Sequence, residues 1–256
     1  MVININNWYL VTVNSSPETV RTKAQLVDSL RTADIDVVGQ FTWGSNFTFL
    51  VELADCGLRA VYKPSQGERP LWDFPPETLA GREVAAYLLS EALGWGLVPP
   101  TVYREAGPAG PGSLQLRIEH DPEMHYFTFD GTTRQRLRPT ALFDLLLNNA
   151  DRKGGHILLD SEEHIWLIDH GICFHAEPKL RTVVWDFVGE QFPEKLAADM
   201  RALAPRLAAG GLRVDLLDYL ASAELEAMQQ RLERLLTDRR YPAPPEDQRA
   251  VPWPPV

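Results

Sequence analysis

The hydrophobic pattern of this chain changes its period near residue 118, and that change constrains the fold more than any other feature. Before it, short stretches rich in β-branched and aromatic residues alternate with Gly, Asn and Asp turns, which is typical of strands. After it, apolar residues recur mostly at helical spacing. The order predicts an α+β protein with two lobes and a cleft between them. We expect a β-rich N-terminal lobe over 1–118, a helical lobe over 119–240 and a proline-rich tail over 241–256.

The expected elements follow from this change of pattern. In the first half the expected strands are 2–13, 36–42, 47–53, 59–62, 101–104 and 113–118, and the expected helices are 16–32 and 77–93. In the second half a helix over 139–149 precedes two short strands, 156–159 and 165–168, and 178–240 is mainly helical. Six prolines among the last 16 residues exclude a helix there, so the tail is predicted to be an extended strap or disordered.

Charge and composition narrow the class of protein. The chain has 35 acidic and 25 basic residues, a net charge of −10, so we expect no nucleic-acid partner. The N-terminal residues lack the pattern of a signal peptide, no apolar run reaches the roughly 18 residues of a membrane span, and two cysteines are too few for a disulfide scaffold. We therefore expect a soluble cytoplasmic protein without stable membrane insertion, and the sequence leaves its oligomeric state open.

Two carboxylates in the segment 148–175 stand out from apolar surroundings. Asp151 comes just after a predicted helix, and Asp169 ends a predicted strand and is followed by Gly171. Burying such a group without a partner is costly. Two of them joined by a β-hairpin indicate a divalent metal site or an acid/base pair, and the alternative is that each caps a turn.

The residues around this pair resemble a family. Protein kinases carry a loop H-R-D-x-x-x-x-N and then D-F-G on the next hairpin. Here Asp151 is followed five residues later by His156 in place of Asn, Lys153 stands where many protein kinases have a phosphate-contacting Lys, and Asp169-His170-Gly171 stands in place of D-F-G. The run Asn-Ala-Asp-Arg is more similar to the phosphatidylinositol 3- and 4-kinase-like branch. The chain thus resembles a small bacterial relative of those kinases, with a two-lobed protein-kinase-like fold.

The resemblance extends into the first half of the chain. Lys63 ends a strand much like the Lys of V-A-I-K, and Glu83 follows 20 residues later in a helix, a spacing that suits the kinase Lys–Glu ion pair. Strand 113–118 takes the place of the hinge, where Leu116 and Ile118 would offer backbone groups to adenine. A turn in the position of the phosphate-covering loop is formed by Gly44, Ser45 and Asn46.

These parts imply an ATP-dependent phosphotransferase that moves the γ-phosphate to a hydroxyl of a protein, a lipid or a small molecule. Asp151 would orient or deprotonate the acceptor hydroxyl, and Lys153 would neutralise the γ-phosphate. Asp169 and His156 would hold Mg²⁺ or Mn²⁺, and an imidazole in place of the family's Asn shifts the preference toward Mn²⁺. Lys63, held by Glu83, would position the phosphates.

Departures from the family keep two other functions open. The G-x-G-x-x-G motif is missing and His156 replaces Asn, which suits a nucleotide-binding pseudokinase with a regulatory role. A kinase fold that transfers the nucleotidyl group is the third reading. A zinc cluster of His170, Cys173 and His175 is disfavoured, because strand alternation would scatter these side chains between two faces. Trp72 and Phe74 are expected to pack in the core, with a substrate or adenine contact as the alternative.

Overall fold

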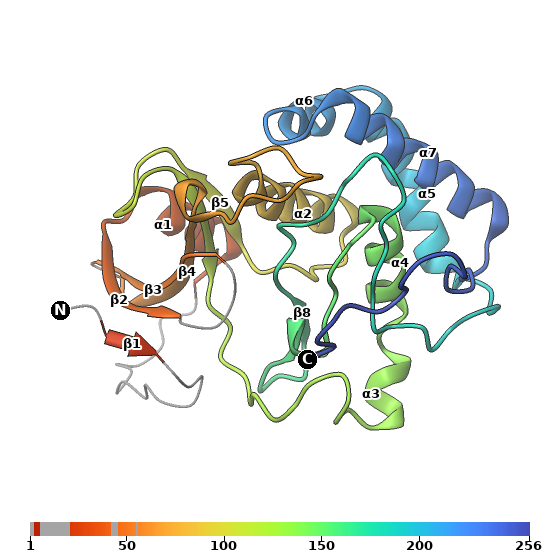
Figure 1. Ribbon diagram of the computed structural model, residues 1–256, viewed down its shortest axis with the longest axis horizontal. Coiled ribbons are helices and arrows are strands. Elements are labelled where there is room, and N and C mark those ends of the chain that lie inside the picture. Colours follow the sequence, from red (N-terminus) through yellow and green to blue (C-terminus); the bar gives the residue numbers. More distant parts are fainter. Residues whose placement is uncertain (1–2, 6–20, 42–45, 55) are drawn as a thin grey trace. The chain divides into compact units, whose positions relative to one another are not determined.

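Figure 1 shows the computed structural model of the chain, which describes residues 3–5, 21–41, 46–54 and 56–256. The chain folds as two compact units. Unit 1 consists of Met1–Ala80 and Pro99–Ile118, and unit 2 consists of Gly81–Val98 and Glu119–Val256. Unit 1 carries the large sheet and unit 2 most of the helices, so the predicted α+β class is confirmed.

Unit 1 is built on a six-stranded sheet with the strand order β1-β2-β3-β4-β6-β5. The strands are β1 (Ile3–Ile5), β2 (Ile35–Phe41), β3 (Thr48–Leu53), β4 (Leu58–Pro64), β5 (Thr101–Arg104) and β6 (Gly112–Leu116). β1 runs parallel to β2, and every other neighbouring pair is antiparallel. Lys63 lies in β4 opposite Ser113 of β6, and residues 6–13 of the predicted first strand lie outside the described residues.

Helix α1 (Lys23–Thr32) lies beside β5 and β6. It begins with a capping box, in which the Thr22 hydroxyl accepts from the Gln25 N–H and the Gln25 side chain accepts from the Thr22 N–H. The predicted start near Ser16 lies outside the described residues, and the predicted end at Thr32 is confirmed. The fully buried Leu30 of α1 joins an apolar core made with the strands: Val51, Leu53, Ala60, Tyr62, Val102 and Leu114.

Helix α2 (Leu79–Leu93) is buried around most of its circumference. Even its charged residues Arg82 and Glu83 are 1% and 2% exposed, so each needs a buried partner. The division between the units falls inside this helix, after Ala80, which leaves Glu83 in unit 2. The sequence pattern predicts this helix as part of the N-terminal lobe, and the division of the chain into lobes stays a prediction.

Unit 2 gathers the remaining helices around an apolar core. They are α3 (Gly131–Gln135), α4 (Arg138–Leu147), α5 (Glu194–Ala208), α6 (Gly211–Leu217) and α7 (Ser222–Asp238). α7 lies against α4, α5 and α6. The core residues Phe143, Met200 and Met228 come from α4, α5 and α7 and are fully buried. Among the described residues, no helix is both long and apolar enough to cross a lipid bilayer.

A short hairpin follows α4 in unit 2. A 3-10 turn, η2 (Gly154–His156), leads into β7 (Ile157–Leu159), which pairs antiparallel with β8 (Ile165–Leu167). The pairing of Ile157 with Leu167 brings the start of one strand beside the end of the other. The residues just before β7 and just after β8 therefore meet at one end of the hairpin, where His156 lies close to Asp169.

The loop of residues 64–76 in unit 1 corrects one expectation. It starts with the 3-10 turn η1 (Ser65–Gly67) and continues without regular structure to α2. Phe74 is buried as predicted, but Trp72 is 92% exposed, so its predicted core packing is wrong. The aromatic character of both residues favoured burial, whereas only one of the two side chains faces the apolar interior.

Candidate active site

The left-handed end of α4 turns the chain toward the first predicted carboxylate. Asn148 caps the helix with φ of 54°, a conformation that Asn tolerates better than most residues. Its side-chain amide donates to the carbonyls of His175 and Glu177, at 2.9 and 2.7 Å, and its Oδ1 accepts from the Lys179 N–H. One side chain thus ends the helix and fastens the segment that follows the second carboxylate.

Backbone hydrogen bonds hold the loop of residues 149–152 on two sides. The Ala150 N–H donates to the Ile172 carbonyl, and the Arg152 N–H donates to the Arg181 carbonyl, both at 3.0 Å. The Arg181 N–H donates back to the Asn149 carbonyl at 2.8 Å. The N–H of Asp151 donates to Asn149 Oδ1, which leaves the Asp151 carboxylate between two fixed neighbours.

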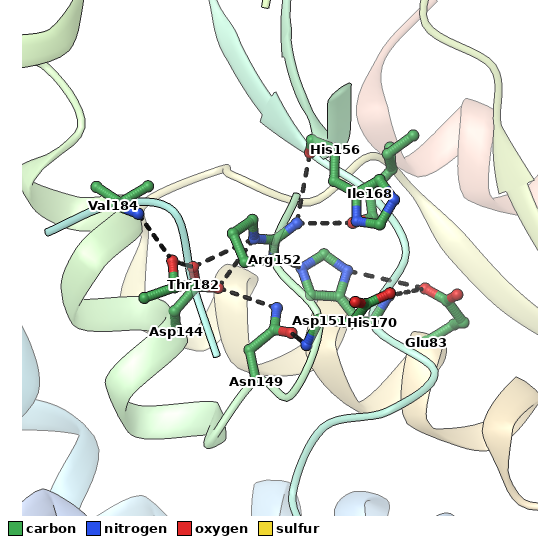
Figure 2. Close-up of polar contacts among 10 residues, drawn as sticks. All are labelled: Glu83, Asp144, Asn149, Asp151, Arg152, His156, Ile168, His170, Thr182 and Val184. Atoms are coloured by element: carbon green, nitrogen blue, oxygen red, sulfur yellow. Dashed lines mark hydrogen bonds and ion pairs between the residues drawn. The ribbon is translucent and has the colours of Figure 1, made fainter. Parts of the chain in front are cut away.

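Arg152 is the buried anchor of this loop (Figure 2). Its guanidinium bonds Asp144 of α4 at 3.0 Å, the Ile168 carbonyl at 2.7 Å and His170 Nε2 at 2.8 Å. Thr182 also donates its hydroxyl to the Asp144 carboxylate, at 2.9 Å. A buried ion pair is tolerated when further hydrogen bonds satisfy it, and here they link α4, the loop and the end of the hairpin.

His170 connects this network to α2. The backbone N–H of His170 donates to Glu83 Oε2 at 2.9 Å, and the ring atom Nδ1 of His170 lies 3.8 Å from the same oxygen. Complete burial, reinforced by the charge of Arg152, lowers the pKa of His170, so the ring is neutral and Nε2 accepts from Arg152. Arg152 bonds both Ile168 and His170, the two neighbours of Asp169, and so helps to fix Asp169, which has a positive φ of 62°.

The environment of Asp151 perturbs its carboxylate. Burial raises the pKa of Asp151 to about 6; the charges of Lys153 and Arg181 oppose this rise, and that of Asp169 adds to it. Lys153 Nζ lies 3.5 Å from Asp151 Oδ2. A carboxylate with a pKa near neutrality, flanked by a flexible cation, suits acid/base work on a hydroxyl.

Asp169 and His156 form the pair that was predicted to hold a metal. Asp169 Oδ2 lies 3.2 Å from His156 Nε2, and the Asp169 side chain is 48% exposed. Two neighbouring ligands of one octahedral cation, each bound at about 2.1 Å, lie about 3 Å apart, so this spacing fits such a pair. Among the described residues, no group of three or more His, Cys, Asp or Glu side chains is placed to hold a metal ion. The alternative of a zinc site at His170, Cys173 and His175 therefore has no support from the structure. Mg²⁺ often takes its remaining ligands from phosphates and water.

The other predicted site residues lie in unit 1 or at its border. The Asn46 side chain accepts from the Arg69 N–H at 2.7 Å, whereas Gly44 and Ser45 lie outside the described residues. The Leu116 N–H donates to the Pro100 carbonyl, so that donor is used within the sheet, and Ile118 follows the end of β6. A pairing of Lys63 with Glu83 would join the two units and stays a prediction.

Sequence reasoning missed the buried network around Arg152. Asp144, Arg152 and His170 are each 0% exposed, and the sequence predicted no buried network among them. One signal was present: Asp144 interrupts an apolar stretch of the predicted helix and is a carboxylate that must find a partner. Nothing in the sequence showed that the partner of Asp144 is Arg152, eight residues later.

Comparisons with known proteins identify the fold and the family. No family model matches the sequence. The Helicobacter pylori proinflammatory kinase CtkA superimposes with a TM-score of 0.51 at 12% identity, over 83% of this chain and 94% of that chain. Hydra Fam20 does so with a TM-score of 0.48 at 17% identity, over 89% of each chain. The chain therefore has a kinase-like fold.

Its family follows from sequence. Protein Rv2133c of Mycobacterium tuberculosis is 40% identical over 263 residues, which cover 88% of this chain and 93% of that protein. The chain belongs to the same family as Protein Rv2133c. A shorter segment is 32% identical to phosphatidylinositol 4-kinase gamma 4 of Oryza sativa, over 41% of this chain and 22% of that protein. The similarity to the lipid-kinase branch is thus confined to part of the chain.

Proposed function

We propose that the chain is an ATP-dependent phosphotransferase that moves the γ-phosphate to a hydroxyl group. The observation that carries this proposal is the placement of Asp151, Lys153, Asp169 and His156 around one loop and one hairpin of unit 2, where a buried network orders them. The kinase-like fold and the similarity to a phosphatidylinositol 4-kinase support it. The acceptor is a protein, a lipid or a small molecule, since a fold does not choose a substrate.

Asp151 would serve the acceptor side of the reaction. Its raised pKa makes the carboxylate a stronger base than an exposed Asp, and the hydrogen bond from the Asp151 backbone N–H to Asn149 Oδ1 helps to position the residue. Lys153, 3.5 Å away, can leave Asp151 to neutralise charge on the transferring phosphoryl group. Most of the rate would come from such positioning and charge stabilisation.

The nucleotide side would use residues of both units. Asp169 and His156 would hold Mg²⁺ or Mn²⁺, which when bound neutralises phosphate charge. Lys63, paired with Glu83, would orient the phosphates, beneath a loop that contains Gly44, Ser45 and Asn46. Ile118 and the carbonyl of Leu116 would face adenine. These roles come from the resemblance to kinases, and each can be tested by substituting the residue.

Labelled ATP separates this function from its alternatives. Transfer of label from the γ position of ATP to protein, lipid or metabolite fractions is the expected result. Label from the α position alone would instead show a nucleotidyl transferase. Nucleotide binding without transfer of either label would show a pseudokinase. Asp151→Asn is the control, and it should abolish transfer while nucleotide affinity stays nearly unchanged.

The metal ligand His156 has its own test. Nitrogen ligands favour Mn²⁺ over Mg²⁺ more than oxygen ligands do. His156→Asn restores an amide oxygen and should raise Mg²⁺-supported activity relative to Mn²⁺-supported activity. His164→Asn, at the far end of the hairpin, is the matched control. An unchanged ratio of the two activities in a folded His156→Asn protein would show that His156 is not a ligand.

A further inference from the structure

The tail of residues 241–256 is ordered against unit 2 although it contains no helix or strand. It starts at Tyr241, which is 4% exposed and contacts the rings of Phe187 and Phe192. In Figure 1 the tail runs back across unit 2 and its end lies at the hairpin that contains β8. The sequence left open an extended strap or disorder for this segment, and the structure shows a strap.

Two tail carbonyls accept hydrogen bonds from the site. The Ala250 carbonyl accepts from the Thr182 N–H at 3.0 Å and from Trp185 Nε1 at 3.2 Å. The Pro255 carbonyl accepts from the Gly154 N–H at 2.7 Å. Pro252, midway between these two anchors, is buried. Tail carbonyls that accept hydrogen bonds from ordered groups of unit 2 show that the segment is docked on unit 2 and does not merely pass over its surface.

The two anchors hold the loop with the candidate catalytic groups at two points: one through Thr182, which pairs with Arg152, and one at Gly154. Thr182 forms a parallel bridge with Arg152 and donates its hydroxyl to Asp144, so the Ala250 anchor supports the buried network. Gly154 directly follows Lys153, so the Pro255 anchor fixes the other end of the same loop.

Gly154 has little freedom in this arrangement. Its carbonyl accepts from the Tyr126 N–H at 3.3 Å while its N–H is bound to Pro255. A Cβ on Gly154 would lie 2.8 Å from the Phe127 ring, so the ring covers the backbone where a side chain would stand. The tail thus closes the last open side of the residue next to Lys153.

We propose that residues 250–255 are positioning residues: the strap holds the loop from Asp151 to Gly154 in the geometry that phosphoryl transfer requires. This role rests on the proposed function, because its consequence for rate exists only if the loop is catalytic. Small displacements of a catalytic group reduce the rate strongly, whereas the groups proposed to hold ATP before transfer, Lys63 and Asp169, lie outside this loop. Releasing the strap should therefore lower kcat and leave the KM for ATP nearly unchanged.

The test uses the full chain with a charged residue introduced into the buried part of the strap. Pro252→Asp puts a carboxylate at the buried midpoint and should release both anchors. Pro244→Asp places the same charge at an exposed tail position and is the matched control. Trp185→Phe removes one of the two hydrogen-bond donors to the Ala250 carbonyl without adding charge. This variant replaces Pro252→Asp in the test if Pro252→Asp does not fold.

Amide hydrogen exchange at Gly154 and Thr182 reports on the strap directly. In Pro252→Asp both amides should exchange at least about tenfold faster, and kcat should fall by about tenfold or more with the KM for ATP unchanged. In Trp185→Phe the faster exchange should be confined to Thr182 with a smaller fall in kcat. Pro244→Asp should match the wild type in all three measurements.

Three results would overturn the inference: fast exchange at Gly154 in the wild type, released amides with kcat unchanged, or a loss confined to the KM for ATP. Absence of γ-phosphate transfer in the wild-type chain would be a failure of the proposed function instead. In that case slow exchange at Gly154 that Pro252→Asp abolishes would still show that the strap holds the loop.

Discussion

At the scale of single residues, Asp151 carries a pH dependence that follows from its burial. Burial raises its pKa to about 6. A general base acts in its deprotonated form, so kcat/KM for the acceptor should fall about tenfold per pH unit below pH 6 and level off above it. A pH–rate profile from pH 4.5 to 8 measures this. A flat profile over that range would contradict a role for Asp151 as base.

The same shift makes a prediction about stability that does not depend on activity. The folded pKa lies above the unfolded value, so the folded state binds more protons between about pH 4 and 6. The free energy of unfolding therefore decreases as pH rises through this window. Asp151→Asn removes the charged form and should be more stable than the wild type above pH 6, by about 1–3 kcal/mol.

Urea denaturation at pH 4.5 and 7.5 measures this difference. The gain should be present at pH 7.5 and small at pH 4.5, where both proteins carry a neutral side chain. Asp215→Asn, at an exposed position of α6, is the matched control for replacing a carboxylate. A variant that is less stable than the wild type at pH 7.5 would show that the Asp151 carboxylate is stabilised rather than strained.

At the scale of elements, the Arg152–Asp144 pair should hold α4 to the loop as one unit. Removing one partner leaves the other charge buried, which typically costs about 3–5 kcal/mol. We expect Asp144→Leu and Arg152→Met each to lose about that much, and the double variant to lose less than their sum. Urea denaturation of the wild type, the two single variants and the double variant gives the free energies of unfolding for this double-mutant cycle. The exposed pair Arg201 and Glu194 is the control, with a coupling below about 1 kcal/mol. Additive losses at Arg152 and Asp144 would contradict the coupling.

These elements also show how far sequence reasoning reaches. The hairpin of β7 and β8 was predictable, because two apolar runs flank the polar turn of residues 160–164. The partner of Arg152 was not, because the network closes through Thr182 and His170, whose positions depend on tertiary packing. The exposure of Trp72 and the docking of Pro255 were hidden for the same reason: neither loop nor tail has a periodic pattern that reports which side faces the core.

At the scale of the whole molecule, the proposed reaction requires the two units to act together. Lys63 lies in β4 of unit 1, and Glu83 lies in α2 in unit 2. If the two form the phosphate-orienting ion pair, Lys63→Met and Glu83→Gln should each lower kcat/KM for ATP by a similar factor, on the order of 10²–10³. Gln keeps an oxygen that can accept from the His170 N–H, so the change tests charge rather than the link to the buried network.

The double variant decides whether the two residues form one functional unit. Both substitutions break the same ion pair, so Lys63→Met/Glu83→Gln should lose no more activity than the more damaging single change. Lys63→Met combined with Glu91→Gln, another carboxylate of α2, is the matched control and should give independent effects. Steady-state kinetics with ATP as the varied substrate measures both pairs. Independent effects of Lys63 and Glu83 would show that they are not partners, although Glu83 would still accept the hydrogen bond from the backbone N–H of His170.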